Sequence, residues 1–264
     1  MCLEQAGVSI NNIDIYVDGA DRVSIDNFIK SGTASPATVK QSNDFFADQA
    51  NNTHENLVMF VTGHGGLEGI DATPPITPHR LLNSIKSSPN LKQAVVYLGQ
   101  CYAGIFNYIG AGSKALANGT NDPNVIFIGA TNLNESLSHS TSETLVTGLQ
   151  NWPANLFLLF AFKWFVNPVD VDGDGKHTII DSYKFAGAIS NHLNKQLKAQ
   201  AFPETHDLQK QWEAAKDAHD HDVSATNLAN LNAAATLYKK HLEIMYVHQE
   251  CWILNAIPSQ QIER

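Results

Sequence analysis

Two residues, His64 and Cys101, have the types and surroundings that covalent catalysis at a carbonyl group requires. His64 comes two residues after the apolar run LVMFVT and precedes two glycines, and Cys101 comes two residues after the apolar run AVVYLG and precedes Gly104. A thiol has a pKa near ~8.5, so a neighbouring imidazole is needed to take its proton at neutral pH. If the two runs form neighbouring parallel strands, both residues lie at the ligand-binding edge of one sheet.

We therefore expect acyl transfer through a thioester, with Cys101 as the nucleophile and His64 as the base and later the acid. The backbone amides of Gly65 and Cys101 are the candidates for binding the developing oxyanion, because glycine lets a peptide approach closely. A single histidine at a strand end is usually a surface residue, and a single cysteine there is usually a core residue. The occurrence of both, each beside glycine, favours the catalytic interpretation.

The motif of an apolar strand with His-Gly, followed by a second apolar strand with Cys-x-x-Gly, resembles the caspase-like cysteine peptidases. The separation of His64 and Cys101 is shorter than the ~50 residues of caspases and is closer to the legumain-like (asparaginyl endopeptidase) branch and its bacterial relatives. The resemblance covers roughly residues 10–195. It implies a three-layer αβα sandwich with a mostly parallel central sheet, and cleavage of peptide or protein substrates. Because an amine as well as water can attack a thioester, transpeptidation is an expected side activity.

Departures from that family concern the substrate pocket and the first strand. Where relatives have Glu or Gln two residues before the cysteine, this chain has Gly99, and Gln100 stands one place late. Specificity for Asn or Asp therefore does not carry over. Ser138 and Ser140 lie where relatives place further pocket residues, so all four positions are candidate substrate contacts. We also expect the fold to lack the family's first strand, either because the sheet has lost it or because the sequence starts inside a longer gene.

A second hypothesis comes from a different functional class. The chain would be a catalytically inactive caspase-like module, stabilised by calcium, that binds a peptide or a partner in the same place. Retention of His64 and Cys101 favours the enzyme, whereas Gly99 and the missing strand favour the binding module.

Residues 170–181 have the spacing of a calcium-binding loop, with oxygen side chains at loop positions 1, 3, 5, 9 and 12 and glycine at position 6. The expected ligands are Asp170, Asp172, Asp174, the carbonyl of Lys176, Thr178 and Asp181. Because position 12 is Asp where Glu is usual, we expect weaker calcium binding or a preference for magnesium. The ion would be structural, joining the helices on either side, and the alternative is a solvated turn.

Short apolar runs between turn residues predict strands, and helical periodicity predicts helices. The expected strands are 10–17, 57–62, 93–98, 124–130 and 250–257. The expected helices are 24–30, 35–50, 77–87, 153–165, 179–198, 207–218 and 226–247. Their alternation predicts an α/β domain over residues 1–198 and a helical extension over 199–264 that ends in the last strand.

Composition excludes several classes of protein. The 26 Asp and Glu outnumber the 17 Lys and Arg, which makes nucleic-acid binding a poor expectation. The longest apolar stretch, 156–166, contains Lys163 and is too short to span a membrane. The three cysteines have no CxxC spacing and predict neither a disulfide framework nor a zinc site, and no motif for an organic cofactor occurs. Without a signal-peptide pattern we expect a cytoplasmic protein, or an exported one if the true start lies upstream.

Overall fold

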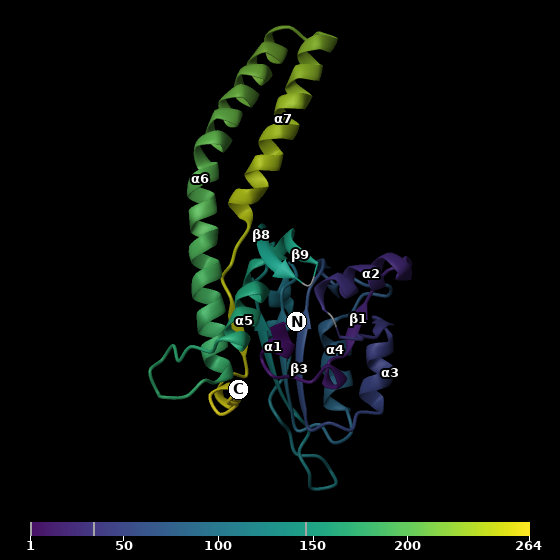
Figure 1. Cartoon of the computed structure of the whole chain (residues 1–264). Helices are drawn as coiled ribbons and strands as arrows, with labels where there is room; N and C mark the ends of the chain where they lie inside the picture. Colours follow the sequence, from purple (N-terminus) through teal and green to yellow (C-terminus); the bar gives the residue numbers. More distant parts are fainter. Residues whose placement is uncertain (1, 34, 146) are drawn as a thin grey trace. The chain divides into compact units, whose positions relative to one another are not determined.

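The computed structural model describes residues 2–33, 35–145 and 147–264. The chain divides into two compact units, one formed by Met1–Ser190 with Gln249–Arg264 and the other by Asn191–His248. The first unit is therefore built from two stretches of sequence, and the second unit is inserted between them (Figure 1). The division expected near residue 198 stays a prediction.

A four-stranded mixed sheet organises the first unit, with strand order β10-β7-β6-β3. β3 (Asn56–Val61), β6 (Gln93–Leu98) and β7 (Asn124–Gly129) run parallel to one another. β10 (Trp252–Leu254) pairs antiparallel with β7. The protein is thus an α/β protein with mixed sheets, as the alternation of predicted strands and helices indicated.

Apolar side chains cover both faces of this sheet. Tyr97 is buried with residues of α5 (Leu156–Val166) on one face, and Val96 is buried with residues of α4 (Pro78–Lys86) on the other. A strand covered on both faces is apolar at every position, which explains the continuous run in β6. β3 is less covered than its sequence suggests, with Val58 45% exposed, because β3 lies at the edge of the sheet.

Side-chain caps determine where two of the helices begin. α4 follows Thr77, whose hydroxyl accepts a hydrogen bond from the N–H of Arg80, and Pro78 occupies the first helical position. α5 follows Asn155, whose Oδ1 accepts a hydrogen bond from the N–H of Leu158 at 3.0 Å. Both caps satisfy N–H groups that have no partner within the helix.

Short elements complete the first unit, and two helices form the second. The other elements of the first unit are α1 (Cys2–Gln5), η1 (Ile10–Asn12), β1 (Ile15–Val17), α2 (Arg22–Gly32), β2 (Val39–Gln41), α3 (Asp44–Ala50), β4 (Gly65–Gly66), β5 (Gly69–Ile70), η2 (Ala103–Tyr108), β8 (Ser138–Leu145), β9 (Gly148–Asn155) and α8 (Ala256–Ser259). α6 (Ile179–His221) begins in the first unit and continues into the second, where α7 (Ala225–Tyr246) follows it.

Several expectations about the elements were wrong. The expected strand 10–17 begins with the 3₁₀ helix η1, and only β1 at its end is a strand. The expected strand 250–257 is limited to β10, because α8 begins at Ala256.

Residues 35–50 are not one helix, because β2 comes first and the carboxylate of Asp44, at the start of α3, accepts a hydrogen bond from the N–H of Gln41. Pro153 does not begin a helix, because it belongs to β9, which pairs with β8 in a hairpin. The two helices expected between 179 and 218 are one helix, α6, which continues through Pro203.

Trp252 attaches β10 to β7, and its removal should destabilise the first unit. Its Nε1 donates a hydrogen bond to the carbonyl of Thr131 at 2.8 Å, and a Cβ added at Gly129 would lie 2.3 Å from the indole ring. We expect Trp252→Ala to lower the free energy of unfolding by about 3–5 kcal/mol, measured by urea denaturation. Trp152→Ala is the control, because Trp152 is 37% exposed in β9 and should cost less than about 1 kcal/mol. Equal costs would refute this role for Trp252.

Candidate active site

β3 and β6 are parallel neighbours, so their carboxyl ends meet at one edge of the sheet. Val61 lies opposite Leu98, and the N–H of Gly99 donates a hydrogen bond to the carbonyl of Val61 at 2.9 Å. His64 and Cys101 stand at the same offset beyond the ends of their strands. The register therefore brings the segments of the two expected catalytic residues to the same edge.

The segment after His64 packs directly on the segment of Cys101. A Cβ at Gly65 would lie 2.3 Å from the carbonyl oxygen of Cys101 and 2.6 Å from Cγ of Gln100, so a residue other than glycine would force one segment away. Gly65 begins the β4–β5 hairpin, and the carbonyl of His64 accepts a hydrogen bond from the N–H of Asp71 at 3.0 Å. His64 itself is exposed. Backbone contacts thus hold the histidine segment against the cysteine segment.

The half-buried thiol of Cys101 faces Ser136. The N–H of Ser136 donates to Sγ at 3.4 Å, and Oγ of Ser136 lies 3.8 Å from Sγ. The same hydroxyl donates to the carbonyl of Gly99 at 2.8 Å. Tyr102 turns the chain sharply with a φ of 55°, and its N–H donates to the carbonyl of Asn134 at 2.8 Å. An N–H group beside the sulfur can donate a hydrogen bond to a thiolate and so stabilise its negative charge.

Asn155 connects this turn to α5. Its Oδ1 caps the helix, while its Nδ2 donates to the carbonyl of Gly99 at 2.6 Å and to Oγ of Ser136 at 3.4 Å. The N-terminus of α5, the positive end of the helix dipole, is therefore attached to the residues around the thiol. Sequence reasoning missed both Ser136 and Asn155. An Asn ahead of an apolar helix was a usable capping signal for Asn155, whereas no spacing marks Ser136.

The four expected substrate contacts lie in two different environments. Gly99 is enclosed, since a Cβ there would lie 2.5 Å from Leu158, and Gln100 is only 1% exposed. Ser138 and Ser140 are exposed at the beginning of β8. In this structure a ligand could reach the two serines, and the side chain of Gln100 points into the protein.

The calcium-type loop brings three of the expected metal ligands together. Oxygens of Asp170, Asp172 and Asp174 lie within 4.8 Å of one another, and this is the only such group of His, Cys, Asp or Glu among the described residues. Asp170 accepts hydrogen bonds from the N–H groups of Gly173 and Gly175 at 2.7 and 2.9 Å. The bond from Gly175 contributes most to holding the pKa of Asp170 below its usual value. Carboxylate oxygens gathered in this way are the donor type that calcium and magnesium prefer.

Two of the remaining expected ligands, Thr178 and Asp181, are hydrogen-bonded to each other. Asp181 is fully buried, and its carboxylate accepts hydrogen bonds from the N–H of Val171 at 2.8 Å and from the N–H and Oγ1 of Thr178 at 2.9 and 3.0 Å. Burial raises the pKa of Asp181, but these hydrogen bonds, above all that from the N–H of Thr178, lower it below its usual value. The expected ligand at Lys176 is its carbonyl oxygen, which stays a prediction, and its Nζ pairs with Glu263 at 3.0 Å. Asp181 therefore anchors the loop to the start of α6.

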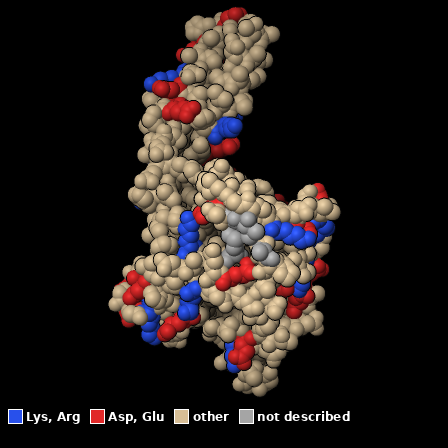
Figure 2. All heavy atoms as spheres, in the orientation of Figure 1, with Lys and Arg blue, Asp and Glu red and all other residues tan. Residues whose placement is uncertain are grey.

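Comparison with models of protein families finds no match, and comparison with curated proteins finds no relative. No helix in the described ranges is both long and apolar enough to cross a membrane. On the face drawn in Figure 2, Lys and Arg side chains are interspersed with Asp and Glu.

The three cysteines should differ in their reactivity. Burial raises the pKa of Cys251 to about 11 and also raises that of Cys2, so both thiols are protonated near neutral pH. We expect iodoacetamide to label Cys101 faster than either, because the thiolate is the reactive form, burial disfavours it at Cys2 and Cys251, and the N–H of Ser136 stands beside Sγ of Cys101. Mass spectrometry of tryptic peptides measures the rates, and protein unfolded in urea is the control. Equal rates in the folded protein would argue against a reactive Cys101.

Proposed function

We propose that this protein is a cysteine endopeptidase of the legumain-like type, in which Cys101 is the nucleophile and His64 is the general base and acid. One observation carries the proposal: His64 and Cys101 follow neighbouring parallel strands at the same offset, with Gly65 against the carbonyl of Cys101. The carboxyl edge of parallel strands is where α/β proteins bind ligands. The N–H of Ser136 at the sulfur adds a donor where charge would develop.

The proposed reaction has two halves. His64 takes the thiol proton as Sγ of Cys101 attacks the peptide carbonyl carbon, and the N–H groups of Gly65 and Cys101 bind the oxyanion. His64 then gives its proton to the leaving amine, so that the C–N bond breaks and a thioester remains. Water, deprotonated by His64, attacks the thioester and regenerates the thiol. An amine in place of water forms a new peptide bond, which is the transpeptidase side activity.

We further infer the family fold for the first unit: a three-layer αβα sandwich with a mostly parallel central sheet that lacks the family's first strand. Two observations support this. Three of the four strands in the main sheet are parallel, and apolar clusters cover both of its faces. β3 is an edge strand of that sheet, and β1 pairs with β2 in a separate two-stranded sheet.

The second candidate function is an inactive module that binds a peptide or partner at the same edge. The closed environment of Gly99 and Gln100 favours it, because the family's pocket residue stands at the position of Gly99. The presence of both His64 and Cys101 favours the enzyme. Peptide cleavage distinguishes the two.

Cleavage of a denatured peptide library, with new termini identified by mass spectrometry, tests the peptidase. We expect Cys101→Ala to abolish the new termini with little change in melting temperature, because the thiol is only half-buried. His64→Ala should slow cleavage at least about 100-fold, the usual contribution of a general base.

Cys2→Ala is the matched control, since it removes a thiol outside the site and should cleave like the unsubstituted protein. Absence of new termini from folded protein, with calcium present, would reject the peptidase and favour the binding module. Termini that persist with Cys101→Ala would show that another residue is the nucleophile.

We also propose that a calcium ion, or the smaller magnesium ion, binds the cluster of Asp170, Asp172 and Asp174 as a structural staple. The loop lies between α5 and α6, and the N–H of Ile179 donates to the carbonyl of Ile262 at 3.0 Å. Nζ of Lys184 already pairs with Asp172 at 2.6 Å, and a cation would neutralise the rest of this acidic cluster and so hold α5, α6 and the segment of Ile262 together. The catalytic steps do not use it.

Removal of the metal should therefore lower thermal stability. At calcium a hundredfold above its dissociation constant, binding stabilises the fold by about 2.7 kcal/mol, which a chelator should remove. Asp170→Ala should lower the melting temperature and abolish its dependence on calcium. Asp26→Ala, which removes an exposed carboxylate of α2, should keep the dependence. Identical melting curves of the unsubstituted protein with calcium, magnesium and chelator would exclude a stabilising metal ion at this cluster.

A further inference from the structure

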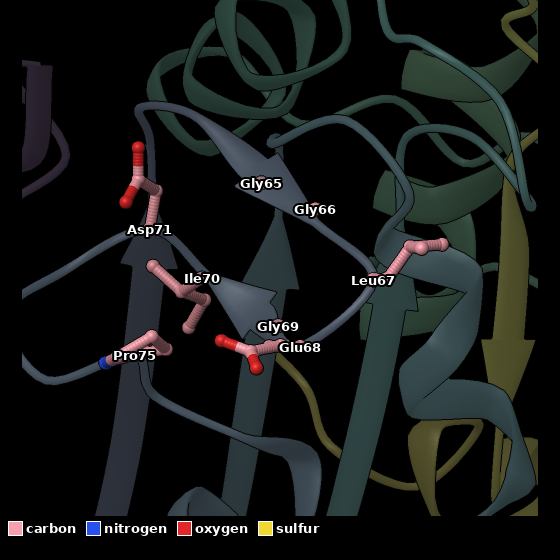
Figure 3. Close-up of a pocket in the computed structure, with 8 residues that line it drawn as sticks. All are labelled: Gly65, Gly66, Leu67, Glu68, Gly69, Ile70, Asp71 and Pro75. Atoms are coloured by element: carbon pink, nitrogen blue, oxygen red, sulfur yellow. The ribbon is translucent and has the colours of Figure 1, made fainter.

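The proposed reaction uses residues of the first unit beside the β4–β5 hairpin (Figure 3), and the second unit has no part in it. The second unit consists of α7 and the part of α6 from Asn191 onward, which together form a helical hairpin. Trp212 of α6 stacks on Tyr238 of α7 with the ring centroids 5.5 Å apart. The side-chain amide of Asn227 donates to the carbonyl of Ala218 at 3.3 Å. The two helices therefore pack against each other.

This helical hairpin buries few of its own apolar side chains. In residues 191–248, all of which the structure describes, Leu208 is the only buried apolar residue. α7, described over its whole length, contains no buried residue, and its Leu237 is 50% exposed. Helices in proteins are stabilised mainly by the packing of an apolar face, so a hairpin that leaves its apolar side chains in water lacks most of that stabilisation. A partner that covers them would supply it.

The outer face of α7, defined by Ala233, Leu237 and Ile244, has the composition of a helix–helix contact. These three exposed residues are four and seven positions apart, so they lie on one side of the helix. No Asp, Glu, Lys, Arg or His occurs from Ala225 to Tyr238. A helix that faces water usually carries charged residues on that side. The small side chain of Ala233 lets a second helix come close.

Charge is distributed unevenly along the helical hairpin. Its tip, residues 216–222, contains three Asp and one Lys, whereas its base, residues 195–206 and 239–248, contains four Lys and two Glu. With neutral histidines, the tip has a net charge of −2 and the base one of +2. Two such hairpins packed in opposite directions bring each tip against the base of the other, so opposite charges meet at both ends. Packing in the same direction would bring like charges together.

We propose that a second copy of this chain covers the outer face, so that two helical hairpins pack antiparallel into a four-helix bundle. With 22 residues, α7 is about 33 Å long, and two helices side by side are about 20 Å wide, so the contact buries about 700 Å² on each copy. Interfaces of stable complexes bury about 600–1,000 Å² per partner. The face is therefore large enough to hold a dimer, whether or not the protein is a peptidase.

The mass in solution tests the dimer, measured by light scattering after size-exclusion chromatography at micromolar concentration. The chain has a mass of 28.9 kDa, and we expect twice that value. Leu237→Glu with Ile244→Glu should raise the dissociation constant at least about tenfold, because it places unpaired charges inside the contact. Both side chains are exposed in the single chain, so we expect helix content to stay the same in circular dichroism.

A matched control separates the outer face from exposed apolar residues in general. Val23→Glu with Phe28→Glu changes two side chains of α2, in the first unit, that are 72% and 63% exposed. This variant should keep the dimer mass. An equal loss of dimer in the control would overturn the assignment of the outer face.

Reversal of charge tests the antiparallel direction. The tip variant is Asp217→Lys with Asp220→Lys, and the base variant is Lys239→Glu with Lys240→Glu. Each variant alone should raise the dissociation constant about three- to tenfold, a limited effect because exposed ion pairs are individually weak. An equimolar mixture of the two should restore the dimer, and high salt should remove all of these differences.

The outcomes that contradict the proposal are distinct. A mass of one chain for the unsubstituted protein would overturn it and leave the outer face to a different protein. A dimer that persists with Leu237→Glu and Ile244→Glu would show that the contact lies elsewhere. If that variant loses helix content, the charge variants decide instead. A dimer that neither charge variant weakens would overturn the antiparallel arrangement.

Discussion

The parallel register of β3 with β6 is the constraint on which the candidate site depends. With Val61 opposite Leu98, the chain leaves both strands side by side, and Gly65 can reach the carbonyl of Cys101. A slip of one residue would move the histidine segment by about 3.3 Å along the sheet and turn every side chain of β3 to the other face. The buried clusters on the two faces of the sheet oppose such a slip. Core packing therefore determines the geometry of the chemistry.

The turn at Cys101 depends on a single carbonyl group, that of Gly99. Ser136 Oγ and Asn155 Nδ2 both donate to it, so the two lone pairs of the oxygen are used. Because Asn155 also caps α5, the helix, the segment of Ser136 and the end of β6 meet at this one oxygen. A change in the position of α5 would thus alter the surroundings of the thiol without contact to any substrate.

Much of the fold could be predicted because burial leaves a local signal. The sequence predicts β6 and β7 as strands because both of their faces are covered, which makes them apolar throughout. It predicts His64 and Cys101 as site residues because both come just after the carboxyl end of a strand. The hairpin of β8 and β9 was missed because most side chains in it are exposed and polar, so it shows no hydrophobic periodicity. Ser136 was missed because its role arises from a contact with Gly99, far from it in the sequence.

The discontinuous first unit has a consequence for synthesis of the chain. β10, with Trp252, completes the main sheet, and the N–H of Ile179 bonds the carbonyl of Ile262. The ribosome makes all of residues 191–248 before it makes β10, the partner of β7, and Ile262, the partner of Ile179. While residues 191–248 emerge from the ribosome, one edge of β7 has no partner strand, and the indole ring of Trp252 does not yet pack against Gly129. During translation, this edge of β7 therefore stays unpaired until the last residues of the chain are made.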